Sequence, residues 1–387
     1  MRVYAIAVFI CIQLHGYGFS QNVRIGISPT KKFNHICFDK PTTEYLVIAD
    51  SSFIGILDAS CTCEIYTAAT GKLGVQFKGE RFSGYTAVRI IATHYNHSIE
   101  LSSSSPVMRS RAYEGDFEMI NEGNKILVIN DVPMEKYLAG VLESEAGEGR
   151  KEEYYKVQAV ISRTFALRSI DKHIKQGFNL CNQEHCQAYF HKRKGSPIID
   201  SAVLATRNQV LYDTKSKFAP TFFSANCGGE TCNPVHVWNN EIPGLVSLVD
   251  TFCTKTKQSK WSCTIDPTEW KAFFVKNYAF PIDDSLSYNL LFSASSEHRN
   301  AFFIHPGYGI PMRDIREKFN LKSSFFSVKL ENNRVILTGK GFGHGVGLCQ
   351  EGAIEMAQLG YNYKQILGFY FPNFILGVSG NLSHLGQ

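Results

Sequence analysis

The first part of the chain alternates apolar and polar residues with the period of two that is typical of β-strands. Between about residues 22 and 115, short runs rich in β-branched residues recur, separated by Gly, Ser, Asp or Asn. We predict strands at residues 23–27, 45–49, 53–57 and 87–91, and another at 125–130. The serine-rich stretch at residues 102–106 is predicted to be a surface loop.

From about residue 131 the apolar positions follow a period of 3.6, which indicates an amphipathic helix. The apolar stripe consists of Met134, Tyr137, Leu138, Val141 and Leu142, with Pro133 in the first turn. At about 100° per residue, Glu145 returns to about 20° from Met134 and should share the buried face. Glu143 lies about 180° from Met134, so we expect it to face water.

A second helix is predicted at residues 151–173, where apolar side chains cover much of the circumference. Such a helix packs on more than one side and is therefore central. A strand at 335–338, a glycine-rich loop at 339–347 and a helix at 351–358 follow late in the chain. The predicted fold class is α+β: a β-rich N-terminal unit at residues 21–120, then a mixed α/β domain at 121–387 with a central helical pair.

The N-terminus has the order of an export signal. Arg2 precedes an apolar run at residues 3–14, and Gly18 and Ser20 are small residues suited to cleavage before Gln21. A buried N-terminal strand is the alternative. No later stretch approaches the roughly twenty apolar residues of a membrane helix. We therefore predict a signal peptide at residues 1–20, no membrane span in the mature chain, and a secreted, periplasmic or cell-wall location.

Composition agrees with export and argues against nucleic acid as a partner. The net charge of +5 comes from 40 basic and 35 acidic residues spread along all 387 positions, without the dense basic stripe of a nucleic-acid binder. Eleven cysteines are many for a cytosolic enzyme, and they suit a compartment where disulfides persist.

Glu145 is the first candidate for chemistry. Burial raises the pKa of a carboxyl, and a glutamic acid that stays protonated near neutral pH can act as a general acid. The alternative is a structural carboxylate paired with Arg163 or Lys156 on the next helix.

Cys181, His185 and Cys186 form the second candidate, because two thiols and an imidazole within six residues can occupy three corners of a tetrahedral zinc site. His173 or His191 could supply the fourth ligand. A disulfide between Cys181 and Cys186 is the alternative.

Two glycine-rich segments complete the candidates. In the first, Gly228 and Gly229 let the backbone approach a ligand closely, and Asn226 and Thr231 are suitable donors to a sugar. A tight turn closed by a disulfide between Cys227 and Cys232 is the alternative. In the second, at residues 341–350, His344 stands among four glycines with little side-chain packing expected around it, which favours a polar or catalytic role.

Four ordered segments resemble the SpoIID/LytB family, sporulation stage II protein D and its relatives. Residues 132–141 (VPMEKYLAGV) are similar to the family's VPLE-x-YL-x-GV, and residues 156–166 to its KAQAVAARTYA helix. Residues 227–231 with 237–238 resemble its SGG-x-T…VW segment. Residues 341–353 (GFGHGVGLCQEGA) are close to GWGHGVGMSQYGA.

The chain also departs from that pattern. Ser224 and Ala225 replace a His-Ser pair, and Cys349 replaces the usual Ser. Family members contain a zinc site of His and Cys near an HC pair. The resemblance therefore implies one structural zinc ion, with Cys181, His185, Cys186 and His173 as its ligands.

The resemblance implies a lytic transglycosylase that cleaves peptidoglycan glycan strands without stem peptides, leaves 1,6-anhydro-muramyl ends, and holds the glycan in a cleft. Glu145 falls at the position of the family's catalytic glutamate. The residues expected to bind the glycan are Gln158, Arg163, Asn226, Gly228, Gly229, Thr231, His344 and Gln350. Some relatives are described as amidase enhancers, so a non-catalytic activator of other cell-wall hydrolases is the alternative. A zinc hydrolase at the Cys-His cluster is a third hypothesis.

Overall fold

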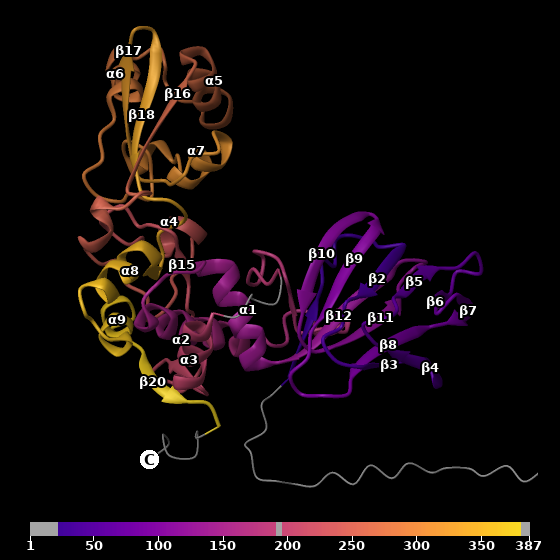
Figure 1. The fold of residues 1–387 in the computed structure, drawn as a ribbon. Helices are drawn as coiled ribbons and strands as arrows, with labels where there is room; N and C mark the ends of the chain where they lie inside the picture. The colour runs from indigo at the N-terminus through magenta and orange to yellow at the C-terminus, as the bar shows by residue number, and fades with distance from the viewer. Residues whose placement is uncertain (1–21, 191–195, 381–387) are drawn as a thin grey trace, which may run out of the picture.

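The computed structural model describes residues 22–190 and 196–380. The predicted signal peptide and His191 lie outside the described residues. Figure 1 shows three parts: a β-sandwich built from the N-terminal strands, a central body of helices, and a smaller lobe that projects from the central body. Among the described residues, no helix is both long enough and apolar enough to cross a lipid bilayer.

The sandwich consists of two sheets of antiparallel strands, with one parallel pair. The seven-stranded sheet has the order β13 (Leu180–Cys181), β1 (Asn22–Gly26), β12 (Ile126–Pro133), β11 (Asp116–Asn121), β8 (Ala87–Ala92), β3 (Tyr45–Ala49) and β4 (Ser52–Leu57). The six-stranded sheet has the order β10 (Val107–Tyr113), β9 (Ile99–Ser105), β2 (His35–Asp39), β5 (Cys63–Thr67), β6 (Leu73–Phe77) and β7 (Glu80–Tyr85). The parallel pair joins β1 to β13, so a segment that follows the central helices completes the first sheet.

The predicted strands are confirmed as β1, β3, β4, β8 and β12. The predicted loop at residues 102–106 is wrong, because residues 102–105 belong to β9. Ser103 is buried there, and its hydroxyl donates to the carbonyl oxygens of His35 and Pro106, at 2.7 Å each. Serine is tolerated in this strand because the hydroxyl finds acceptors inside the sheet.

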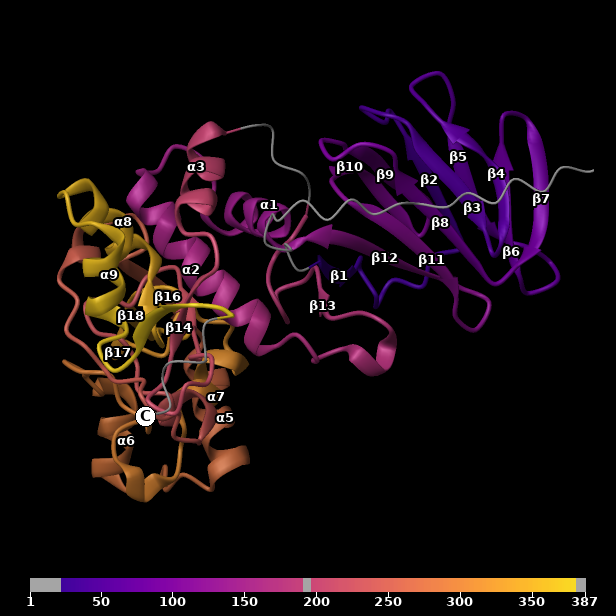
Figure 2. The ribbon, with the colours of Figure 1, turned by 90° about the horizontal axis from the view of Figure 1, so that it is seen from below.

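The central body is built around α1 (Met134–Ala146) and α2 (Glu152–Arg168), which confirm the predicted helical pair. The second helix ends five residues before the predicted boundary, since residues 169–173 form turns. The body is completed by α3 (Pro197–Ala205), α4 (Val235–Trp238), α8 (Gln350–Gln358), α9 (Tyr363–Tyr370), the β14 (Gln209–Tyr212) and β20 (Ile375–Val378) pair, and the β15 (Phe223–Ser224) and β19 (Leu348–Cys349) pair. Figure 2 shows α8 and α9 beside α2, on the side away from the sandwich.

The smaller lobe lies within residues 260–340 and has its own hydrophobic core. Its elements are β16 (Lys260–Ile265), β18 (Arg334–Lys340) and β17 (Phe326–Glu331), which form one sheet, with α5 (Pro267–Tyr278), α6 (Ser285–Ser293) and α7 (Met312–Lys318). Trp270 and Phe274 are fully buried in its core. The sandwich and the central body share the other core, which runs from Val23 through α1 and α2 to Tyr370.

A buried ion pair holds α1 against α2. Arg163 is 1% exposed, and its Nε donates to Glu135 Oε1 at 3.1 Å, while a second guanidinium nitrogen donates to Glu135 Oε2. The same guanidinium also donates to the carbonyl oxygen of Gln209 at 3.2 Å. Removing one partner of such a pair leaves the other charge uncompensated, which destabilises a protein strongly.

We therefore predict that Arg163→Ala lowers the free energy of unfolding by about 3 kcal/mol. The matched control is Lys329→Ala, which breaks the exposed pair between Lys329 and Glu331 and should cost about 0.5 kcal/mol or less. Urea unfolding followed by circular dichroism measures both. An Arg163→Ala variant as stable as the control would contradict the structural role of the pair.

Candidate functional site

Glu145 lies in the last turn of α1 and is half-buried. Its Oε1 accepts a hydrogen bond from the backbone N–H of Ala188 at 2.8 Å. Burial raises the pKa of the Glu145 carboxyl, and the nearby charge of Glu184 adds to the rise, while the Ala188 N–H opposes it. Glu145 is therefore a carboxyl whose protonated form is favoured by its surroundings.

Neither of the cations proposed as structural partners reaches Glu145. Lys156 pairs with Glu152 at 3.3 Å and with Glu153 at 2.7 Å, and Arg163 pairs with Glu135. In the part of the chain that the structure describes, Glu145 is therefore not a structural carboxylate paired with Lys156 or Arg163.

The expectation that Glu143 faces water is wrong. Glu143 is half-buried, and its Oε2 is shielded from solvent. The angular position on α1 places Glu143 opposite the apolar stripe. However, the angle carries no information about segments that cover that side from elsewhere in the chain.

A group of polar side chains lies next to Glu145, on the face of α2 toward the start of α8. Burial raises the pKa of the Tyr154 hydroxyl, and both Gln350 and Glu145 lie close enough to influence it. Gln158 follows Tyr154 by one helical turn on the same face of α2. Ser224 lies opposite Cys349 in the β15–β19 pair, one residue before Gln350.

Four polar atoms in this group are shielded from solvent and have no hydrogen-bond partner in the described structure: the Tyr154 hydroxyl oxygen, Gln158 Oε1, Ser224 Oγ and Gln350 Nε2. Buried polar atoms in native proteins are almost always paired, so such a cluster indicates a place where a polar ligand or water binds. Tyr154 thus lies near both Glu145 and Gln350, and Gln158 lies one turn further along α2. Tyr154 was missed, although its spacing of four from Gln158 was visible in the sequence.

The two glycine-rich segments lie backbone to backbone. At Gly347, where φ is +74°, an added Cβ would lie 2.2 Å from the carbonyl oxygen of Phe222. At Gly341, an added Cβ would lie 2.6 Å from the carbonyl oxygen of Asn226. Only glycine permits this approach, so the glycines serve packing between the segments.

The expectation that His344 has little packing around it is wrong. Its ring lies 5.4 Å from that of Trp238 and 6.4 Å from that of Phe222, and its Nδ1 accepts the N–H of Val346 at 3.0 Å. Burial, with the charges of Arg316 and Arg299, lowers the pKa of His344 to about 4. His344 is therefore a neutral, half-buried residue that shapes its loop.

Several predicted glycan contacts are used inside the protein instead. Asn226 is fully buried, and its amide donates to the Cys253 carbonyl, Thr256 and Glu351. Thr231 is fully buried, and its hydroxyl accepts the N–H of Leu248. Arg163 forms the pair with Glu135. In the described structure these three residues have structural partners, because their polar groups are paired away from solvent.

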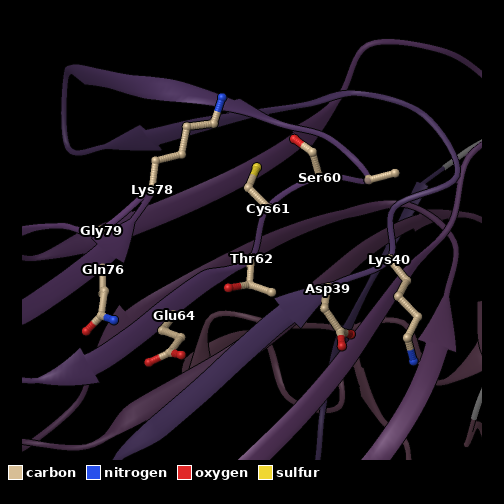
Figure 3. A pocket seen from close by; sticks show the side chains of 10 residues that line it. Asp39, Lys40, Ser60, Cys61, Thr62, Glu64, Gln76, Lys78 and Gly79 are labelled. Carbon is tan, nitrogen blue, oxygen red and sulfur yellow. The ribbon is translucent and has the colours of Figure 1, made fainter.

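Gly228 and Gly229 line a cavity of about 260 Å³ between the central body and the smaller lobe. At Gly228, where φ is +77°, an added Cβ would lie 2.7 Å from that of Lys340. A second cavity of about 490 Å³ lies on the sandwich, lined by both acidic and basic side chains including Asp39, Glu64 and Lys78 (Figure 3). None of the predicted glycan-binding residues lines the second cavity.

His173, Cys181, His185 and Cys186 come together as predicted, with one ligand atom from each within 4.8 Å of the others. Cys186 Sγ lies 3.5 Å from His173 Nε2, and His185 Nδ1 lies 3.8 Å from Cys181 Sγ and 3.9 Å from Cys186 Sγ. A tetrahedral zinc ion separates its sulfur and nitrogen ligands by about 3.6 Å. The four residues therefore fit a zinc ion.

The tautomer of His173 agrees with this fit. Its Nδ1 lies 2.6 Å from Gln176 Oε1, an atom that can only accept a hydrogen bond. This contact suits the tautomer with its proton on Nδ1, in which the lone pair of Nε2 faces Cys186. Metal-binding histidines are commonly oriented in this way by a partner on the other ring nitrogen.

The segment after the cluster leads directly to Glu145. Cys186 is followed by Gln187, whose Oε1 accepts the hydroxyl of Tyr137 at 3.1 Å, and then by Ala188, which donates to Glu145. Phe190 N–H donates to Ser144 Oγ at 3.3 Å. Residues 187–190 thus run along α1 and connect the Cys-His cluster to the backbone that contacts Glu145.

Comparisons with known proteins agree with the motifs. The family described as stage II sporulation protein, SpoIID, matches residues 122–212. An uncharacterized protein of Brachyspira hyodysenteriae is 32% identical over 263 residues, which cover 67% of this chain and 70% of that protein. Stage II sporulation protein D of Bacillus subtilis is 28% identical over 258 residues, covering 63% and 74%. The amidase enhancer of Bacillus subtilis is 25% identical over 293 residues, covering 62% and 40%.

The fold, the ordered motifs and these relatives define a protein with a function related to the cell wall. The chain belongs to the SpoIID/LytB family.

The raised pKa of Glu145 predicts how stability depends on pH. The folded chain holds the Glu145 proton to a higher pH than the unfolded chain does, so this residue's contribution to stability falls as pH rises through that window. Glu145→Gln, which has no proton to lose, should gain stability relative to the wild type between about pH 4 and about pH 7. Thermal unfolding of both proteins at the two pH values measures the change.

Glu148→Gln is the matched control, because Glu148 is exposed just beyond the end of α1. Its stability relative to the wild type should stay nearly constant over the same range. If Glu145→Gln behaved like this control, Glu145 would be a solvated carboxylate.

Proposed function

We propose that this protein is a peptidoglycan lytic transglycosylase that cleaves glycan strands lacking stem peptides, with Glu145 as both general acid and general base. The observation that carries the proposal is the Glu145 carboxyl itself. It is half-buried, accepts one backbone N–H, and is not paired with Lys156 or Arg163. A single carboxyl with a raised pKa suits a reaction in which one residue first gives and then takes a proton.

The reaction uses one carboxyl in two steps. The Glu145 carboxyl donates its proton to the glycosidic oxygen as the bond between C1 and that oxygen breaks. The resulting carboxylate takes the proton of the same sugar's 6-hydroxyl while its oxygen bonds to C1. The products are a free hydroxyl on one strand and a 1,6-anhydro ring on the other, and Glu145 regains its proton.

The polar group beside Glu145 is the proposed glycan site. Gln158, Ser224 and Gln350 offer a carbonyl oxygen, a hydroxyl and an amide nitrogen that are otherwise unpaired, and Tyr154 offers an aromatic ring with a hydroxyl. Sugar hydroxyls need both donors and acceptors, so this set is complementary to a glycan. An exported location, as the predicted signal peptide implies, would bring the protein to this substrate.

One structural zinc ion bound by His173, Cys181, His185 and Cys186 is part of the proposal. Four protein ligands close the coordination sphere, which favours a structural ion over a catalytic one and argues against a zinc hydrolase. The ion would supply rigidity: it would fix residues 187–190 along α1, and therefore the Ala188 N–H against Glu145.

A second candidate function is activation of a cell-wall amidase without glycan cleavage. The similarity to an amidase enhancer over 62% of this chain favours it. The two functions differ in their demand on Glu145, since an activator needs the surface of the protein but no proton transfer from this carboxyl.

We predict that Glu145→Gln lowers the rate of formation of anhydro-muramyl ends by at least about 100-fold, because the amide cannot donate and take the proton. Binding to the glycan should persist. Mass spectrometry of products from peptide-free strands measures turnover, and sedimentation with cell walls measures binding. Glu148→Gln is the control and should be fully active.

An absence of anhydro ends with the wild type, together with retained wall binding, would favour the activator instead. In that case both wild type and Glu145→Gln should increase the rate of a purified cell-wall amidase equally.

We predict that the double variant Cys181→Ser, Cys186→Ser loses one zinc ion per chain relative to the wild type, because it removes two of the four ligands of this cluster. Its rate of glycan cleavage should fall, while the structure outside residues 173–190 should change little. Elemental analysis measures zinc, and the strand assay measures turnover. The matched control is Cys263→Ser, because this half-buried cysteine of β16 belongs to neither cluster. Equal zinc in wild type and double variant would rule out this site.

A further inference from the structure

A second cluster of metal-binding groups lies beneath the two glycine-rich segments. It consists of Cys227, Asp250, Cys253 and Cys349, all buried, with one ligand atom from each within 4.8 Å of the others. Cys227 follows β15, Cys253 lies in the short helix η2 (Phe252–Lys255), and Cys349 is the last residue of β19. Its four residues are too far apart along the chain to form a recognisable metal-binding motif.

The distances in the cluster match a metal site better than a disulfide. Cys227 Sγ lies 3.4 Å from Cys253 Sγ and 3.2 Å from Asp250 Oδ2. Ligands of a tetrahedral zinc ion are separated by about 3.8 Å for two sulfurs and about 3.5 Å for sulfur and oxygen. Small adjustments of side chains would therefore accommodate the ion. A disulfide would use two of the three sulfurs and leave the third beside a carboxylate.

Hydrogen-bond donors surround the cluster and point at its ligand atoms. Cys349 Sγ accepts the backbone N–H groups of Cys227 at 3.2 Å and of Gly352 at 3.4 Å. Asp250 Oδ2 accepts the Tyr370 hydroxyl at 2.9 Å, and its Oδ1 accepts the Phe252 N–H at 3.0 Å. Donors to thiolate and carboxylate ligands are typical of the surroundings of a metal ion.

The charges in the cluster also call for a cation. Among residues 22–190 and 196–380, no cationic side chain contacts the Asp250 carboxylate or the three sulfur atoms. A buried carboxylate without a counter-ion is costly, and a divalent metal would compensate it together with ionised thiols. Thiolate-rich tetrahedral sets are characteristic of zinc.

We propose that Cys227, Asp250, Cys253 and Cys349 bind a second zinc ion, separate from the one at the Cys-His cluster. With four protein ligands the site is structural. The ion fastens the two glycine-rich segments to each other and to α8, since Cys227 precedes Gly228 and Cys349 precedes Gln350.

The packing of α8 is consistent with this role. At Gly352, an added Cβ would lie 2.5 Å from Asp250 Oδ2 and 2.2 Å from the Tyr370 hydroxyl oxygen. The first turn of α8 can approach Asp250 this closely only because residue 352 lacks a side chain. The cluster is therefore enclosed by backbone, which shields a bound ion from solvent.

The test is the zinc content of the double variant Cys227→Ser, Cys349→Ser, produced as the full chain in reducing medium supplied with zinc. Serine is the residue that the family pattern has at both positions, so the variant should fold, as circular dichroism will verify. We expect it to hold one zinc ion fewer per chain than the wild type. Cys263→Ser should hold as many as the wild type. Equal zinc in the double variant and the wild type would overturn the proposal.

A second measurement on the unmodified chain keeps the proposal testable if the variant fails to fold. Native mass spectrometry of the wild type should show two zinc ions per chain, one of which persists in Cys181→Ser, Cys186→Ser. A wild type without zinc, or that variant without zinc, would overturn the proposal. Peptide mapping of protein isolated after export gives an independent check. A disulfide between Cys227 and Cys253 in that material would also overturn it, whether or not the protein cleaves glycan.

Discussion

The hydrogen bond from the Ala188 N–H to the Glu145 carboxyl is the contact on which the proposed chemistry depends. It fixes the carboxyl at the end of α1, while burial disfavours its ionised form. A carboxyl with a full ion-pair partner would remain ionised, and a fully exposed one would titrate like a free glutamate. The environment of Glu145 lies between these extremes, which is the requirement for a group that acts as acid and then as base.

That contact depends on segments distant in sequence. Ala188 follows two residues after Cys186 of the Cys-His cluster, and Cys181 of the same cluster ends β13, which completes the seven-stranded sheet alongside β1. The β15–β19 pair places Ser224 opposite Cys349, which directly precedes Gln350. The sandwich thus supports one side of the site and the glycine-rich segments the other. The two proposed zinc sites would stiffen the backbone segments that carry their ligands.

Much of the fold could be predicted from local patterns, because α1, α2 and five strands of the sandwich have clear periodicity. The helical period and the motifs single out Glu145, Gln158 and Gln350, and the Cys-His spacing predicts its cluster. Local patterns failed where distant segments decide the outcome. The angle of Glu143 on α1 does not show that its Oε2 is shielded from solvent. Ser103 fits inside a strand because its hydroxyl donates to the carbonyl oxygen of His35 in the neighbouring strand β2.

The same limit explains the remaining errors. His344 seemed isolated among glycines, but Trp238 and Phe222 arrive from another segment to pack on its ring. The cluster of Cys227, Asp250, Cys253 and Cys349 joins positions more than 120 residues apart, so no spacing rule could find it. The core of the smaller lobe is dominated by aromatic residues without a clear period.

The central claim is that Glu145 must be protonated for the glycosidic bond to break. The most direct measurement is the pH dependence of the rate at which the wild type forms anhydro-muramyl ends on peptide-free strands. The account predicts that the rate falls as pH rises through a pKa above that of an ordinary glutamic acid. A rate that stays constant or increases through this range would contradict the role of Glu145 as the proton donor.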